Sequence, residues 1–197
     1  MEPVSFYEAP TRKELWNLLD QTCSENCDYV VIPHNSNLSN GYMFEEPDQD
    51  EMLIQSTKEP LVEIFQHKGS SECNVDPNDP LCNFEQLPYK DFRSKFQNDL
   101  SSSPDSSFVR EALGKGLLFQ DRQSINPLKF GVIASTDTHL GTPGAVDESS
   151  FQGHGGAGKS FRSSIPEGLP DDIEFNPGGL AVAWAEENSR SAIFDAF

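Results

Sequence analysis

A short apolar run that ends abruptly in polar, chemically active side chains constrains the fold of this chain more than any other feature. The clearest copy is Phe130-Gly-Val-Ile-Ala-Ser-Thr-Asp-Thr-His139, whose first half is typical of a strand buried on both faces. In an extended chain Asp137 and His139 project to the same side. A carboxylate and an imidazole placed in this way can bind one divalent metal ion. On this spacing alone, a strand that ends in a polar turn with His139 hydrogen-bonded is the simpler interpretation.

Two other apolar runs end in the same manner. Residues 28–32 lead into His34, and residues 61–66 lead into a polar cluster that includes Lys68 and Glu72. In barrel enzymes the chemistry lies at the carboxyl ends of the strands. Three strand ends that carry polar and ligand-forming groups are a stronger argument for a metal site than any one of them. For His34 alone, packing within a polar turn is the competing interpretation.

Strands and helices alternate along the chain. Thr11 and Glu14 form a capping box, which predicts the start of a helix. Gly114 and Gly116 are expected to end another helix. We expect helices at 12–22, within 43–58, at 108–113 and from 189, and strands at 28–32, 61–66, 130–135 and 180–184. Residues 74–107, with a short helix near 90–98, and residues 142–177 are expected to be long loops. Strand, polar exit and helix in repetition are typical of a parallel α/β architecture, either open or barrel-shaped.

Length and charge bound the class of protein. The chain has 197 residues, enough for one domain with a core. A net charge of -18 argues against a nucleic-acid partner, because no basic patch is present to displace counterions from phosphates. The sequence contains no run of about 18 apolar residues, so it predicts no membrane span. The residues after Met1 lack the basic and apolar regions of a signal peptide.

The four cysteines form two close pairs, Cys23 with Cys27 and Cys73 with Cys82. Neither pair has the spacing of a zinc site. Two local disulfides and four reduced thiols are nearly equal interpretations. Disulfides would indicate an oxidising compartment.

Glu63 lies inside an apolar run, where an unpaired carboxylate would be costly. It therefore needs a cation or a hydrogen-bond donor nearby. Lys68 and Glu72 are candidates for substrate contacts, and a surface ion pair of little energetic value is an equal alternative.

Residues Gly153 to Ser160 match the phosphate-loop pattern G-x4-G-K-S. That motif needs a buried strand before it and a helix after it. The flanking residues suit neither element, so nucleotide binding is rejected. A glycine-rich active-site loop that presents His154 remains an alternative.

Six longer blocks of the sequence are Ile32–Gly41, Pro60–Glu72, Gly131–His139, Gly153–Gly158, Asn176–Leu180 and Trp184–Arg190. Together they resemble one known family, domain of unknown function 3604, a relative of the PHP (polymerase and histidinol phosphatase) metal-dependent phosphoesterases. The resemblance covers nearly the whole chain.

The resemblance implies an α/β fold: a distorted (β/α) barrel with a mainly parallel sheet, long loops and bound divalent metal ions, whether Zn, Mn, Fe or Mg. By its motifs His34, Asp137 and His139 would be metal ligands. The family opens with a strand bearing H-x-H, which is absent from this sequence. Residues 1–197 are therefore expected to be a single-domain fragment of the barrel, without its N-terminal metal-binding strand and its C-terminal end.

The expected function of the parent protein is metal-dependent hydrolysis, phosphoesterase-like, with metal-activated water. Lys68 would steady a small anionic substrate, and Glu63 or Glu72 would orient groups or transfer protons. The alternative is a non-catalytic metal- or ligand-binding module that retains half of the site. The fragment alone is expected to bind metal weakly and to have little activity, and its open sheet edges are expected to favour association, such as an oligomer, or partial disorder. The resemblance further implies a periplasmic or secreted parent protein.

Overall fold

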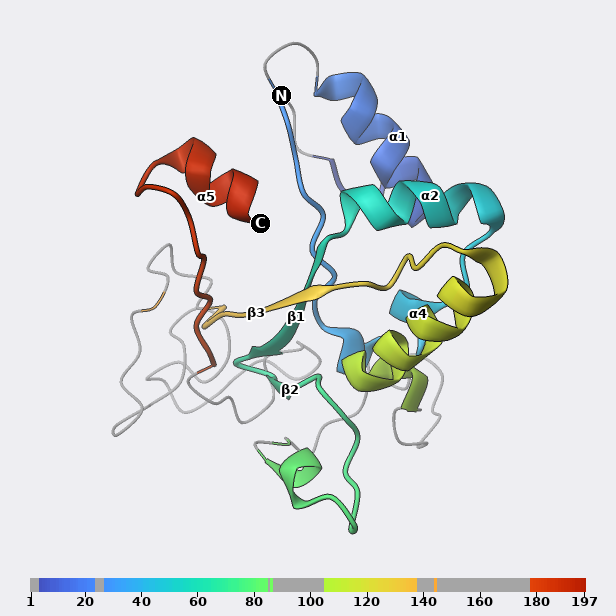
Figure 1. The fold of residues 1–197 in the computed structure, drawn as a ribbon, viewed down its shortest axis with the longest axis vertical. Helices are drawn as coiled ribbons and strands as arrows, with labels where there is room; N and C mark the ends of the chain where they lie inside the picture. The colour runs from blue at the N-terminus through green and yellow to red at the C-terminus, as the bar shows by residue number, and fades with distance from the viewer. Residues whose placement is uncertain (1–3, 24–26, 85, 87–104, 138–143, 145–177) are drawn as a thin grey trace.

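A central strand, β1 (Leu61–Gln66), organises this computed structural model, which describes residues 4–23, 27–84, 86, 105–137, 144 and 178–197. β1 pairs in parallel with β3 (Gly131–Ala134) and antiparallel with β2 (Gly69–Ser70), in the order β2-β1-β3 (Figure 1). The predicted strands at 61–66 and 130–135 are therefore confirmed, and they are parallel neighbours. The described residues form a mixed α/β structure with an open sheet rather than a closed barrel.

The predicted strand at 28–32 is wrong as a strand. Two backbone hydrogen bonds hold the chain there: Val31 N donates to O of Lys58, which precedes β1, at 2.9 Å, and Glu63 N of β1 donates to Pro33 O at 3.0 Å. These bonds place the segment next to the start of β1 without building the repeated ladder that defines a strand.

The predicted strand at 180–184 is also wrong, since no ladder includes these residues within the described part of the chain. Leu180, Val182 and Trp184 are 78%, 80% and 93% exposed. The expectation that the strand after Phe130 is buried on both faces fails as well, because Val132 of β3 is 54% exposed. Within the described sheet β3 lies at an edge and is paired along one side.

Four helices lie among the described residues. α1 (Arg12–Thr22) begins at the predicted Thr11–Glu14 capping box, and α2 (Gln49–Lys58) begins at a second one formed by Asp48 and Glu51. α5 (Arg190–Ala196) begins at Ser189, whose hydroxyl accepts a hydrogen bond from Ala192 N. The helices predicted in these three regions are confirmed.

The fourth helix, α4 (Val109–Gln123), is longer than expected. It continues through Gly114 and Gly116 and ends at Ser124, which has a left-handed backbone with φ of 61°. A glycine costs a helix only about 1 kcal/mol, so packing can outweigh it. At Gly116 that packing is visible, because a Cβ there would lie 2.3 Å from Oδ1 of Asn126.

The hydrophobic core joins β1 to α2 and α4, which Figure 1 shows beside the strand. Its buried members are Phe44, Met52, Val62, Val109, Ala112, Phe119 and Leu128. Val62 is the member from β1, so one side of the central strand is anchored in this core.

Both predicted disulfides form, Cys23–Cys27 after α1 and Cys73–Cys82 after β2. Among the residues placed here, no helix has the length and apolar character needed to cross a bilayer. The helix expected near 90–98 and the glycine-rich loop with His154 lie outside the described residues.

Candidate functional site

Buried and half-buried polar side chains gather where β1 and β3 end. Because the two strands are parallel, their carboxyl ends meet at one edge of the sheet. We call the group at this edge the polar cluster. It consists of Asn37, Glu63, Gln66, His67, Lys68, Ser71, Ser135 and Asp137.

Glu63 receives the partners that its buried position in β1 requires. Gln66 Nε2 donates a hydrogen bond to its Oε2 at 2.8 Å, and the Ser135 hydroxyl donates to its Oε1. The register of β1 and β3 shifts between Glu63 and Phe65. The carboxylate is thus held by one donor from its own strand and one that follows β3.

Lys68 is 2% exposed and lies in the two-residue turn between β1 and β2. Its Nζ donates to Asn37 Oδ1 at 2.6 Å and to Ser71 Oγ at 2.7 Å. Burial lowers the pKa of Lys68 to about 7, although the nearby carboxylates of Glu63 and Asp137 act to raise it. Near neutral pH this amine therefore exists in both protonation states.

His67 precedes Lys68 in the same turn and faces Asp137. The distance from His67 Nε2 to Asp137 Oδ2 is 3.5 Å. A normal hydrogen bond spans about 2.7–3.2 Å. Two ligand atoms at about 2.1 Å from a tetrahedrally coordinated ion lie about 3.4 Å apart. The separation is that of an ion pair when His67 is protonated, and it is also compatible with two ligands of a shared cation.

Sequence reasoning did not place His67 among the metal ligands. Its signal was its position, directly after the last residue of a confirmed strand and beside a buried lysine. The pairing with Asp137 joins two strand ends that are far apart in the chain. Only the parallel arrangement of β1 and β3 brings them together.

Three of the predicted site residues, Glu63, Lys68 and Asp137, meet in the polar cluster. Glu72 does not belong to it, because its side chain is exposed and pairs with Arg110 at 2.6 Å. Its predicted role in orientation or proton transfer finds no support in this position.

Of the two other predicted metal ligands, the structure describes only His34. His34 is exposed, and its Nδ1 lies 3.4 Å from Ile32 O. His139 lies outside the described residues. Within the residues that are described, no group of three or more His, Cys, Asp or Glu side chains is arranged to hold a metal ion.

The start of α4 helps to fix the chain that follows Lys68. The backbone amides of Val109 and Arg110 donate to the carbonyls of Ser71 and Glu72 at 3.0 and 2.9 Å. Amides in the first turn of a helix have no partner within it, so these bonds satisfy them. They also hold Ser71 where its hydroxyl can accept from Lys68.

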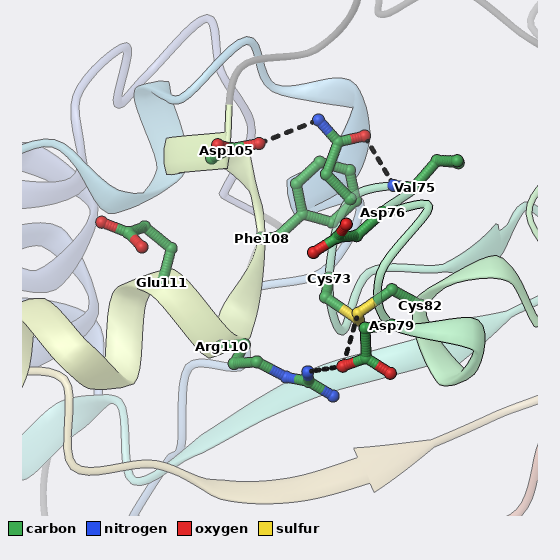
Figure 2. A pocket seen from close by; sticks show the side chains of 10 residues that line it. Cys73, Val75, Asp76, Asp79, Cys82, Asp105, Phe108, Arg110 and Glu111 are labelled. Carbon is green, nitrogen blue, oxygen red and sulfur yellow. Dashed lines mark hydrogen bonds and ion pairs between the residues drawn. A yellow bond between two sulfur atoms is a disulfide. The ribbon is translucent and has the colours of Figure 1, made fainter.

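A separate cavity of about 310 Å³ lies between the Cys73–Cys82 loop and the start of α4 (Figure 2). Figure 2 shows Arg110 directed at Asp79, with Nη1 and Oδ2 2.7 Å apart. None of the ten lining residues is a member of the polar cluster. The cavity and the cluster are therefore distinct features of the fold.

Comparison with known proteins identifies one family. The model of the family described as "Protein of unknown function (DUF3604)" matches residues 1–197. No curated protein and no solved structure matches the chain.

Proposed function

This chain belongs to the DUF3604 family of proteins of unknown function, and we propose that its polar cluster is part of the site of a metal-dependent hydrolase. The observation that carries the proposal is the pair His67 Nε2 and Asp137 Oδ2. Its separation of 3.5 Å suits two ligands of one cation. The pair lies at the carboxyl ends of parallel strands, where α/β proteins commonly bind ligands.

The chemistry of the donors supports a divalent metal, with Zn, Mn, Fe and Mg all candidates. An imidazole nitrogen and a carboxylate oxygen are ligand types that these ions accept. The resemblance noted in the sequence adds His34 and His139 as proposed further ligands. When bound, the ion would lower the pKa of a water molecule and polarise a substrate oxygen.

The other members of the cluster have roles that follow from their contacts. Lys68 can present an ammonium group to a small anionic substrate, because Asn37 and Ser71 accept two of its hydrogen bonds and hold Nζ in place. Glu63, held by Gln66 and Ser135, is a carboxylate near the ammonium group of Lys68. A phosphoester is the substrate class that this combination of cation and ammonium suits best.

The fold and location form part of the same proposal. Parallel pairing of β1 with β3 is compatible with a section of a distorted, PHP-like (β/α) barrel. The two disulfides are compatible with a periplasmic or secreted parent protein, because disulfides persist in oxidising compartments.

The proposal is tested by calorimetric titration of Mn²⁺ and Zn²⁺ into the wild-type chain and the His67→Ala and Asp137→Asn variants. We expect each substitution to weaken metal binding by about tenfold or more. Hydrolysis of p-nitrophenyl phosphate and of bis(p-nitrophenyl) phosphate is measured on the same samples. Asp121→Asn is the matched control, because it neutralises an exposed carboxylate on α4.

Three outcomes bear on the proposal. Metal binding and turnover that both depend on His67 and Asp137 support the hydrolase. Metal binding through this pair without turnover of either ester supports the metal site, and it is the result expected both for a non-catalytic binding module and for residues 1–197 of a hydrolase tested alone. Metal affinity that neither substitution changes would refute the site.

A further inference from the structure

We infer that Gly178 and Gly179 form a positioning turn that holds the backbone of Ser135 to Asp137, so that the Asp137 carboxylate faces His67. The role assigned to that pair rests on the function proposed above. Gly178 and Gly179 lie more than 40 positions after Ser135 in the chain, yet they pack directly against the end of β3.

The first observation is the absence of space for a side chain at either glycine. A Cβ at Gly178 would lie 2.4 Å from the Ser135 carbonyl oxygen and 2.7 Å from Thr136 Cα. A Cβ at Gly179 would lie 2.5 Å from the Cβ of Ala134. Cβ contacts this short essentially never occur in proteins. The turn can therefore approach the end of β3 only because both residues lack a side chain.

The second observation is a hydrogen bond that fixes the approach. The amide of Gly179 donates to the carbonyl of Ser135 at 2.7 Å. Ser135 also donates through its own amide to Phe65 O at 3.0 Å and through its hydroxyl to Glu63. Ser135 is thus tied at once to β1 and to the glycine turn.

The third observation is the backbone of Asp137, which is left-handed with φ of 51°. For a residue other than glycine this conformation is less favourable than an ordinary backbone with negative φ. Such a conformation persists where surrounding contacts impose it. Thr136, the residue before it, is buried, and its Oγ1 accepts from Gly144 N at 3.0 Å.

These contacts make the position of Asp137 dependent on the turn. If the turn moves away from Ser135, the backbone of Asp137 is free to return to an ordinary φ. Its carboxylate then no longer points at His67 Nε2. The expected result is a defect in the polar cluster and not in the hydrophobic core, since none of the atoms nearest to a Cβ at Gly178 or Gly179 belongs to a core residue.

The test uses the full 197-residue chain and two readouts, the Mn²⁺ affinity from calorimetry and the ¹⁵N resonances of the His67 ring at one fixed pH. Gly179→Ala should weaken Mn²⁺ binding about 10- to 100-fold, as expected for an outer positioning contact, and should shift the His67 resonances. The double variant Ala134→Gly/Gly179→Ala moves the methyl group from one side of the contact to the other, so it should restore both readouts. Gly114→Ala is the control, because a Cβ at Gly114 meets nothing within 4 Å.

Each outcome decides the inference. Gly179→Ala with wild-type affinity and unshifted His67 resonances would overturn it, as would a double variant that folds but recovers neither readout. If Gly179→Ala does not fold, Ala134→Gly alone decides, because it loosens the contact without a clash and should weaken Mn²⁺ binding severalfold; an unchanged affinity and an unshifted ring would refute the positioning role. If the wild-type chain binds no Mn²⁺, the proposed hydrolase fails, and the His67 resonances still report whether the turn positions Asp137.

Discussion

The ammonium nitrogen of Lys68 lies 2.6 Å from the amide oxygen of Asn37, a residue 31 positions earlier in the chain. This contact joins the segment that follows residues 28–32 to the turn between β1 and β2. It brings together the polar residues that follow residues 28–32 and those that follow β1, although residues 28–32 do not form a strand. The contact between these two regions is therefore made by side chains and not by strand pairing.

Lys68→Met should change how stability depends on pH. In the folded chain the pKa of Lys68 is about 7, against an ordinary value of 10.5. Between pH 7 and pH 10.5 the unfolded chain therefore binds more protons than the folded chain does. The unfolding free energy of the wild type should therefore rise relative to Lys68→Met between about pH 7 and pH 10, by on the order of a few kcal/mol. Urea denaturation at several pH values measures this. Lys129→Met, at an exposed site, should run parallel to the wild type, and a constant gap for Lys68→Met would contradict the burial of its charge.

Glu59→Gln should stabilise the chain at mildly alkaline pH. Glu59 is buried, and burial raises the pKa of its carboxyl, opposed by a hydrogen bond from Gln55 Nε2 at 2.9 Å and by Arg12. A raised folded pKa means that wild-type stability is lost as pH rises through that pKa. A glutamine keeps an acceptor for Gln55 without the charge. The melting temperature of Glu59→Gln should therefore exceed that of the wild type at pH 8, and the difference should shrink at pH 4. Glu46→Gln, at an exposed site, should show no such trend.

The two glycines of α4 should respond to alanine in opposite directions. Gly114→Ala should raise the unfolding free energy by about 0.5–1 kcal/mol, because alanine favours the helix and a Cβ there meets nothing within 4 Å. Gly116→Ala should lower it by about 1–3 kcal/mol through overpacking against Asn126. Asn126 cannot move freely, since its Oδ1 accepts from Leu128 N at 2.9 Å. Equal effects of the two substitutions in urea titrations would show that the contact is relieved at no cost.

Replacing Cys73 and Cys82 together by serine should destabilise the chain by about 2–3 kcal/mol. The bridge closes a loop between cysteines that are nine positions apart in the sequence. Replacing Cys23 and Cys27 should cost less, since their separation is four. Chemical denaturation without reductant measures both. A larger effect at Cys23 and Cys27 would mean that loop closure is not the dominant contribution.

Local features were readable from the sequence alone. The Thr11–Glu14 capping box, the strands at 61–66 and 130–135 and both cysteine pairs are set by residues close together in the chain. Capping and strand propensity depend on near neighbours, so the local sequence was enough to predict these elements. The spacing of the cysteines identified the two pairs but left disulfides and reduced thiols as nearly equal interpretations. The sequence also showed that Glu63 needs a partner, because an unpaired carboxylate inside an apolar run is costly whichever group pairs with it.

Other features were decided by contacts between distant residues. α4 runs through Gly114 and Gly116 because tertiary packing outweighs the small helix penalty of glycine. His67 faces Asp137 because two strands from distant parts of the chain are parallel neighbours. The approach of Gly178 to Ser135 likewise has no local signal, since a glycine pair in the sequence does not show which backbone it must let pass. Local energies select helices and strands, whereas the site depends on which of them become neighbours, and that is decided by burial across the whole chain.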